Sequence, residues 1–298
     1  MFNLNFTICL SQKQQERDFI VRLALVEKLG PVSRFKLWRL AHEAGVFDFE
    51  KLFEQYSVNS RITKIVKEQC QRIEFDLTFE YFRHSYPFIT IIDDDYPPLL
   101  KETACPPILI YYYGSPSILK SKTLAVVGSR RMTKYGNKII NALVPPVVNA
   151  GVTIVSGLAR GVDSTAQRVA LECGGKVVGV IGCGLTQAYP KENRDLQDEI
   201  MRAGLLLSEY PIGTPPYPHH FPERNRIIAG VCHTCLVVES AQKSGTLITA
   251  NIALRENRNV CAVPGPIDVS SSVGCNELIE IGARPILKPS DLLDELDT

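Results

Sequence analysis

The sequence lacks an excess of charge of either sign. Its 298 residues carry 33 lysines and arginines against 32 aspartates and glutamates, a formal net charge of +1. A protein that binds nucleic acid indiscriminately through bulk basicity needs a large positive excess, so this mode of binding is excluded. Any site for a polyanion must therefore be a local cluster of cations.

Long apolar runs are also missing. No stretch approaches the ~20 apolar residues that cross a bilayer. The first residues, MFNLNFTICLSQKQQERD, lack the basic start, apolar run and cleavage site of a secretory signal. The nine cysteines are scattered, and Cys232-x-x-Cys235 has no second ligand pair to complete a zinc site. We expect a cytosolic protein with reduced thiols, no membrane contact and no bound metal.

The loops that hold common cofactors are absent. No G-x-G-x-x-G follows the first apolar run of the second half, and G-x-x-x-x-G-K-[ST] occurs nowhere. Neither a dinucleotide cofactor nor NTP hydrolysis is therefore expected. The five histidines are scattered and form no evident set with a nucleophile. These absences favour a binding protein without cofactor over an enzyme.

What is present divides the chain in two. Between residues 17 and 81, apolar residues recur at three- and four-residue spacing, and Leu29-Gly30-Pro31 separates two helices. After Gly114, short runs rich in Val, Ile and Leu alternate with helical segments; these runs are LAVVG, VTIVSG, KVVGVIG, LLLSEY, TCLVVES and NVCAVPG. Such runs predict strands buried on both faces. We expect a small helical domain over residues 1–85, followed by a doubly wound, mainly parallel α/β domain over residues 86–298.

Glycines, small hydroxyls and cations follow the expected strands. They occur in the segments GSRRMTKYG, SGLARGVD, YPKEN and ESAQKSGT. In an open α/β sheet these segments meet in the crevice beyond the carboxyl ends of the strands. Close backbone approach, free helix N–H groups and guanidinium groups suit a phosphate. Asp163 is the exception, because its place before STAQRVAL predicts a helix cap.

The segment FPERNRIIAG places Arg224 and Arg226 close to Phe221. The two arginines can neutralise neighbouring phosphates while Phe221 stacks on an unpaired base, a combination typical of single-strand binders. Two alternatives stay open: a helix start with its arginines in solvent, and Phe221 as a hydrophobic staple for a helix beginning near Asn225.

The chain resembles a known family through motifs that occur in the family's order. They are GSRRMTKYG, SGLARGVDSTAQRVAL, GVIGCGLTQAYPKEN, FPERNRIIAG, VVESAQKSGTLITANIAL and VPGPID. The resemblance is to the DNA processing protein A (DprA/Smf) family and runs from about Tyr96 to the C-terminus. It implies a Rossmann-like domain behind a sterile-alpha-motif-like (SAM-like) helical domain. The implied function is to bind and protect incoming single-stranded DNA, as a homodimer, and to load the RecA recombinase onto it in natural transformation.

The resemblance also assigns residues. Arg130 looks like the principal phosphate-binding arginine and Phe221 like the base-contacting aromatic residue. The implied DNA-binding set is Gly128, Ser129, Arg130, Lys191, Phe221, Arg224, Asn225, Arg226, Ser244 and Thr246. The C-terminal segment is apolar beyond what a short tail buries alone, and the family's dimer contact is expected there, at Leu278, Ile279, Leu292 and Leu293.

An enzyme is the rival interpretation. SGLARGVD and KSGTLITA faintly resemble the motifs of lysine-decarboxylase-like phosphoribohydrolases, which cleave the glycosidic bond of a nucleoside monophosphate. Glu239 or Glu209 would then assist catalysis. Against this, the glutamate that follows the P-G-G-x-G-T turn in that family has no counterpart here, where Leu247 and Ile248 follow Thr246.

Overall fold

The computed structural model describes residues 11–297 and divides the chain into two compact units. The first unit runs to Tyr86 and also takes in residues 90–92 and 107–109. The second comprises residues 87–89, 93–106 and the chain from Ile110 onward. Among the described residues, no helix is both long and apolar enough to cross a membrane.

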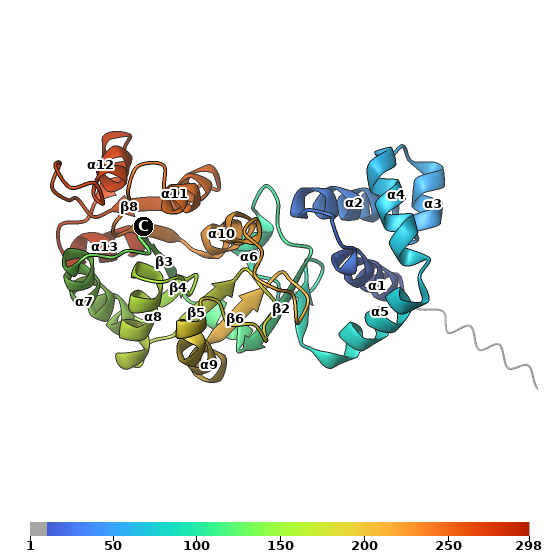
Figure 1. Ribbon diagram of the computed structural model, residues 1–298, viewed down its shortest axis with the longest axis horizontal. Helices are drawn as coiled ribbons and strands as arrows, with labels where there is room; N and C mark the ends of the chain where they lie inside the picture. The colour runs from blue at the N-terminus through green and yellow to red at the C-terminus, as the bar shows by residue number, and fades with distance from the viewer. Residues whose placement is uncertain (1–10, 298) are drawn as a thin grey trace, which may run out of the picture. The chain divides into compact units, whose positions relative to one another are not determined.

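The first unit is built from helices, as the spacing of apolar residues predicts (Figure 1). They are α1 (Gln12–Leu25), α2 (Pro31–Ala44), α3 (Phe49–Gln55), α4 (Ser60–Cys70) and α5 (Ile73–Ser85). Gly30 caps α2 and Pro31 occupies its first turn, where the missing N–H of proline costs nothing. The expected all-helical N-terminal region is confirmed.

The second unit contains the expected parallel sheet. Across residues 11–297 the sheet has nine strands in the order β1-β2-β6-β5-β4-β3-β7-β8-β9. They are β1 (Phe88–Thr90), β2 (Leu109–Gly114), β3 (Thr123–Val127), β4 (Thr153–Ser156), β5 (Val177–Ile181), β6 (Leu205–Ser208), β7 (Thr234–Val237), β8 (Asn259–Ala262) and β9 (Arg284–Pro285). Neighbours from β6 to β9 pair in parallel, and β2 is antiparallel to β6. The mainly parallel fold class is therefore confirmed.

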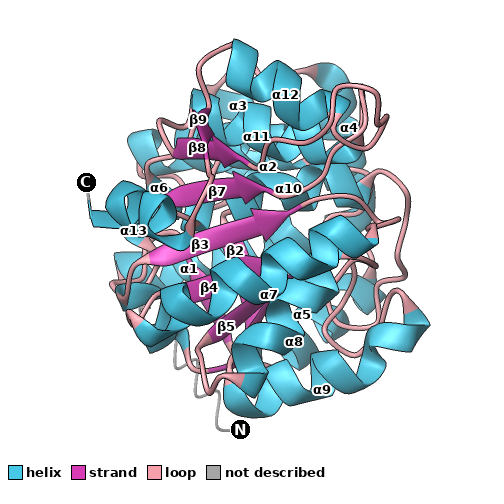
Figure 2. Ribbon diagram, turned by 90° about the vertical axis from the view of Figure 1, so that its left-hand side faces the viewer, coloured by secondary structure: helices cyan, strands magenta, loops and turns pink. Residues whose placement is uncertain are grey.

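Helices cover both faces of this sheet. They are α6 (Pro98–Lys101), α7 (Lys134–Asn149), α8 (Val162–Glu172), α9 (Arg194–Ala203), α10 (His220–Val231), α11 (Gly245–Arg255), α12 (Val273–Glu280) and α13 (Pro289–Asp297). Helices α7, α8 and α9 lie on one face, and α10 and α11 lie on the other (Figure 2). The strand order reverses between the adjacent strands β3 and β7. Such a switch point is where an open α/β sheet binds its ligand.

Helix α10 begins earlier than the sequence predicts. It starts at His220 rather than near Asn225. Pro222 lies in the first turn, where a helix tolerates proline. Phe221 is therefore a helical residue of that turn, and the staple interpretation, which places it ahead of the helix, is wrong.

The C-terminal segment corrects two of the expected dimer residues. Leu278 is 3% exposed and Leu292 is fully buried, so both belong to the core of this chain rather than to its surface. Helix α13 is held there by Lys122, whose Nζ donates to the carbonyl of Leu296. Ile279 and Leu293 are half-buried. The apolar side chains that this segment leaves in solvent are Ile281 and Leu287, 70% and 76% exposed.

Candidate nucleic-acid interface

A pocket of about 460 Å³ opens at the switch point between β3 and β7. Its walls come from the segments that follow these strands and from α10 and α11. Eight of the residues expected to bind DNA line it: Gly128, Ser129, Arg130, Phe221, Arg224, Asn225, Ser244 and Thr246. The fold thus brings together residues that are up to 118 positions apart in the chain (246 − 128). We call this hollow the central pocket.

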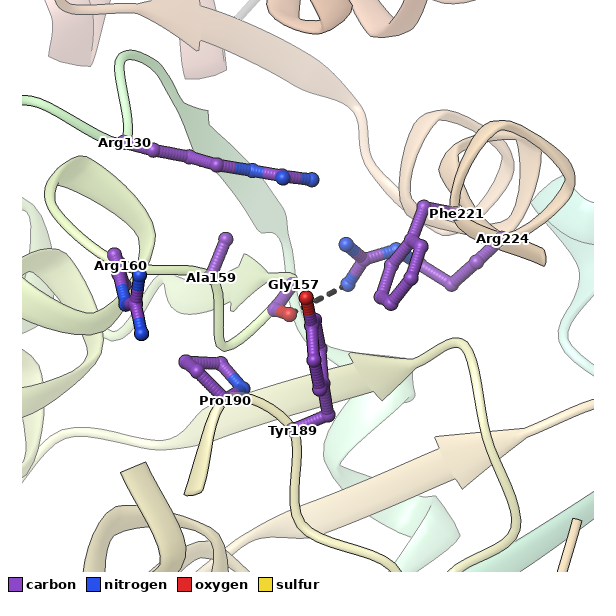
Figure 3. Close-up of a pocket in the computed structure, with 8 residues that line it drawn as sticks. All are labelled: Arg130, Gly157, Ala159, Arg160, Tyr189, Pro190, Phe221 and Arg224. Atoms are coloured by element: carbon purple, nitrogen blue, oxygen red, sulfur yellow. Dashed lines mark hydrogen bonds between the residues drawn. The ribbon is translucent and has the colours of Figure 1, made fainter. Parts of the chain in front are cut away.

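A smaller pocket of about 50 Å³ adjoins it on the side of β4 and β5 (Figure 3). The two pockets share Arg130, Ala159, Phe221 and Arg224. Gly157, Arg160, Tyr189 and Pro190 complete the smaller one. Arg160 is paired with Glu192, so its charge is already neutralised.

Arg130 and Phe221 stand between the two pockets. Arg130 is exposed, and its Cζ lies 5.8 Å from the centroid of the half-buried Phe221 ring. Within the part of the chain that the structure describes, no acidic side chain pairs with Arg130. An unpaired guanidinium beside an aromatic ring offers a phosphate contact and a stacking surface together.

Tyr189 adds a second ring that the sequence analysis did not single out. It is 45% exposed, and its ring centroid lies 5.1 Å from that of Phe221. Figure 3 shows the two rings near the smaller pocket, which both line. The segment YPKEN carries the signal, because Tyr189 is an aromatic residue two positions before the cation Lys191.

Arg224 lies at the floor of the site and is not an exposed phosphate contact. Its side chain is buried, and Nη1 donates to the carbonyls of Gly157, at 2.6 Å, and Val180. Burial lowers the pKa of Arg224, while buried Asp163 opposes that effect. Nη2 has no hydrogen-bond partner among the described residues, and Figure 3 shows this end of the guanidinium facing the pocket. Arg224 therefore lines the pockets beside Phe221, as expected, but from a buried position.

Asp163 also differs from its expected role. The N-cap of α8 is Gly161, and Asp163 lies inside the first turn. Its Oδ2 accepts the amide of Gly157 at 3.1 Å. Burial raises the pKa of Asp163, and the charge of Arg224 works against that shift. The carboxylate thus fixes the turn after β4 and balances the charge of Arg224.

Arg226 is turned away from this site. Its Nη2 lies 2.5 Å from both carboxylate oxygens of Glu209, and its Nη1 donates to the carbonyl of Cys105 at 2.6 Å. The side chains of Arg226 and Glu209 are 15% and 5% exposed. The expectation that Arg226 neutralises a phosphate beside Phe221 is wrong for this structure, because its charge is already paired.

The other residues expected to bind DNA, Lys191, Ser244 and Thr246, lie at the edges of the two pockets. Lys191 is exposed in the short turn Lys191–Asn193, directly after Pro190 of the smaller pocket. On the opposite wall, Ser244 caps α11 and its Oγ lies 2.7 Å from the Oγ of Ser240. The first N–H groups of α11, with Gly245 and Thr246 in the wall, give the central pocket the positive end of a helix dipole.

The carboxylates of the rival enzyme interpretation have structural partners. Glu239 is 3% exposed, and it accepts hydrogen bonds from the backbone N–H and the hydroxyl of Thr133, the N-cap of α7. Glu209 is the partner of Arg226. Neither group is free to act on a nucleotide in this arrangement.

The cysteine pair near β7 is buried. Burial raises the pKa of the Cys232 thiol to about 12, and its Sγ contacts the carbonyl of Ala229 at 3.4 Å. Residues 11–297 contain no group of three His, Cys, Asp or Glu side chains arranged to hold a metal ion.

Comparisons with known proteins agree on one family. The family described as DNA recombination-mediator protein A matches residues 87–297. DNA processing protein DprA of Streptococcus pneumoniae is 44% identical over 212 residues, covering 71% of this chain and 75% of the relative. The crystal structure of that species' DprA superposes with a TM-score of 0.86 at 35% identity, over 93% of this chain and 97% of the other.

A second solved structure is informative about ligands. It is DNA processing protein A of Helicobacter pylori, described for its single-stranded DNA binding mode. Its TM-score is 0.64 at 29% identity, over 71% of this chain and 96% of that one.

Proposed function

Because this chain belongs to the DNA recombination-mediator protein A (DprA/Smf) family, we propose that it binds single-stranded DNA in the central pocket and the smaller pocket beside it. The observation that carries the proposal is the exposed, unpaired guanidinium of Arg130 next to the ring of Phe221. Duplex DNA hides the faces of its bases, whereas a single strand presents both phosphates and unstacked bases. The near-neutral net charge of +1 fits a protein that holds one strand at one local site.

We expect Arg130→Ala to weaken binding to single-stranded oligonucleotides of any sequence. Loss of one phosphate contact should lower the slope of log K against log salt by about 0.7 for a single strand. Fluorescence anisotropy titrations at four or more salt concentrations measure both quantities. Lys176→Ala removes an exposed cation at the amino end of β5 and is the matched control.

The same titrations can contradict the proposal. If Arg130→Ala and Lys176→Ala show equal affinity and equal salt slope, Arg130 makes no phosphate contact. Equal affinity of the wild-type protein for single-stranded and double-stranded oligonucleotides would also count against a single-strand site.

The proposal extends to protection of incoming strands, to loading of RecA and to a cytosolic homodimer, which the family resemblance implies. The apolar surface of Ile281 and Leu287 supports a contact between copies near the C-terminus. Leu278 and Leu292 cannot take part without leaving the core of their own subunit. The half-buried Ile279 and Leu293 complete this candidate contact.

We expect Ile281→Glu combined with Leu287→Glu to give a folded monomer. Charges on a desolvated contact oppose association, whereas these exposed positions contribute little to folding. Sedimentation velocity gives the oligomeric state, and circular dichroism reports the fold. Ile73→Glu with Leu77→Glu, an exposed apolar pair on α5, is the control. A dimer that persists in the first variant places the interface elsewhere.

The rival proposal of a phosphoribohydrolase is less well supported, because Glu209 and Glu239 are both engaged in structural contacts. Incubation of the protein with nucleoside monophosphates, followed by chromatography for free base, distinguishes a phosphoribohydrolase from a protein that only binds DNA. Sustained release of base that is abolished by Glu239→Gln would favour the enzyme.

A further inference from the structure

A third hollow lies farther along the same edge of the sheet. It measures about 500 Å³ and is lined by residues that follow β3, β7 and β8, among them Tyr135, Glu239, Pro264, Pro266 and Val269. The smaller pocket draws on the ends of β4 and β5, the central pocket on β3 and β7, and this one extends to β8. The three hollows therefore follow the strand order β5-β4-β3-β7-β8.

The walls of this third hollow suit a flat, uncharged group. The ring of Tyr135 is 40% exposed and is held in place because its hydroxyl donates to the carbonyl of Pro264 at 2.8 Å. Pro264, Pro266 and Val269 form much of the remaining wall. Ile267, on the same loop, is 93% exposed and adds apolar surface in contact with water. The carboxylate of Glu239 at the base of the hollow disfavours a phosphate.

Two lysines lie close to Tyr135 in the sequence of α7. Lys134 directly precedes Tyr135, and Lys138 is one helical turn farther along the same helix. Residues three and four apart on a helix are neighbours on its surface, so Lys138 lies beside both Tyr135 and Lys134 on the surface of α7. Both lysines are exposed, and among residues 11–297 neither has an ion-pair partner. In a chain with a net charge of only +1 this pair is a local positive patch.

We propose that the bound strand continues from the central pocket into this third hollow, where one base stacks on Tyr135 and the adjoining phosphates contact Lys134 and Lys138. This inference rests on the proposed function, because it extends the same strand along the same edge. An aromatic ring next to unpaired cations is the arrangement with which proteins hold successive nucleotides of a single strand. The negative charge of Glu239 in the wall of the hollow disfavours a phosphate there and favours phosphates on the side of the lysines.

The charge contacts are tested with Lys134→Gln combined with Lys138→Gln. Two lost phosphate contacts should lower the salt slope by about 1.4 and the affinity at 0.1 M salt by about 25-fold. Oligo(dT) of 4 to 20 nucleotides is titrated, and the length at which affinity stops rising should be shorter in the variant. Lys120→Gln with Lys176→Gln makes the same charge change at the amino ends of β3 and β5 and should match the wild type.

The stacking contact is tested separately at Tyr135. Tyr135→Ala should weaken binding of the longer oligonucleotides by about 5- to 160-fold, the effect of removing one base–aromatic stack. Tyr135→Phe keeps the ring, loses the hydrogen bond to Pro264 and should bind as the wild type. If the two variants are equally weak, Tyr135 acts through that hydrogen bond, and stacking is overturned.

Arg130→Ala in the same length series separates this inference from the proposed function. If Arg130→Ala weakens oligonucleotides of every length while the Lys134/Lys138 variant equals its control, only the third hollow is refuted. If Arg130→Ala also equals the wild type, the proposed site itself fails, and the extension fails with it.

Discussion

Arg226→Ala is expected to lower the free energy of unfolding by about 3 to 5 kcal/mol, the cost of leaving one partner of a buried ion pair alone. The Glu209 carboxylate is 5% exposed and is held by Arg226 at 2.5 Å. Burial disfavours the charge of Arg226, but Glu209 and Cys105 hold its pKa above the ordinary range. Removal of the guanidinium leaves the buried Glu209 carboxylate without its partner Arg226. Urea denaturation followed by circular dichroism measures the loss.

A double substitution tests this explanation. Arg226→Met with Glu209→Leu removes both charges and should recover most of the lost stability, since a buried pair replaced by apolar groups is often neutral. Arg202→Ala, at an exposed position on α9, is the control and should change stability by less than about 0.5 kcal/mol. If Arg226→Ala unfolds like the wild type but loses affinity for DNA, Arg226 is a DNA contact, as the sequence analysis expected.

The different positions of Arg224 and Arg226 follow from helix geometry. Residues two apart on a helix do not face the same way, whereas residues three and four apart do. Phe221, Arg224 and Asn225 therefore share the face of α10 that lines the central pocket, and Arg226 points elsewhere. A helix beginning near Asn225, as the sequence predicts, would leave Arg224 outside the helix and would not separate the two arginines by this geometry; the actual helix begins at His220. Helix α13 shows the same dependence of burial on helix geometry. Leu292 and Leu293 are adjacent in the sequence, but only Leu292 is fully buried.

The strands of the sheet could be predicted because their chemistry is local. Runs such as LAVVG and KVVGVIG are apolar on both faces, and β3 and β5 are fully buried. The gathering of Gly128, Phe221 and Ser244 was predictable from strand order, since the carboxyl ends of parallel strands meet. The partners of individual charges were not predictable. Arg160 with Glu192 and Arg226 with Glu209 depend on which side chains the folded loops bring within reach.

Phe221→Ala is expected to reduce affinity for single-stranded DNA by about 1 to 3 kcal/mol with the salt slope nearly unchanged, because loss of a stacked base releases no counterions. The ring lies between the two pockets, 5.1 Å from the Tyr189 ring and 5.8 Å from the Cζ of Arg130. Phe221→Trp, which keeps an aromatic face, should retain most of the affinity. Tyr217→Ala removes a 48% exposed ring from the loop before α10 and is the matched control.

The unchanged salt slope separates Phe221 from Arg130, whose loss should lower both affinity and slope. Phe221 also packs close to Gly182, where an added Cβ would lie 3.3 Å from its ring, so its removal could act through the fold. Thermal melting and oligonucleotide affinity are therefore measured on the same preparation. Normal melting with weakened binding supports a base stacked on Phe221. Normal melting with wild-type affinity would show that Phe221 is not part of the interface. If Phe221→Ala lowers the melting temperature, Phe221→Leu is measured as well. A Phe221→Leu variant that melts normally but still binds weakly would assign the ring to DNA binding.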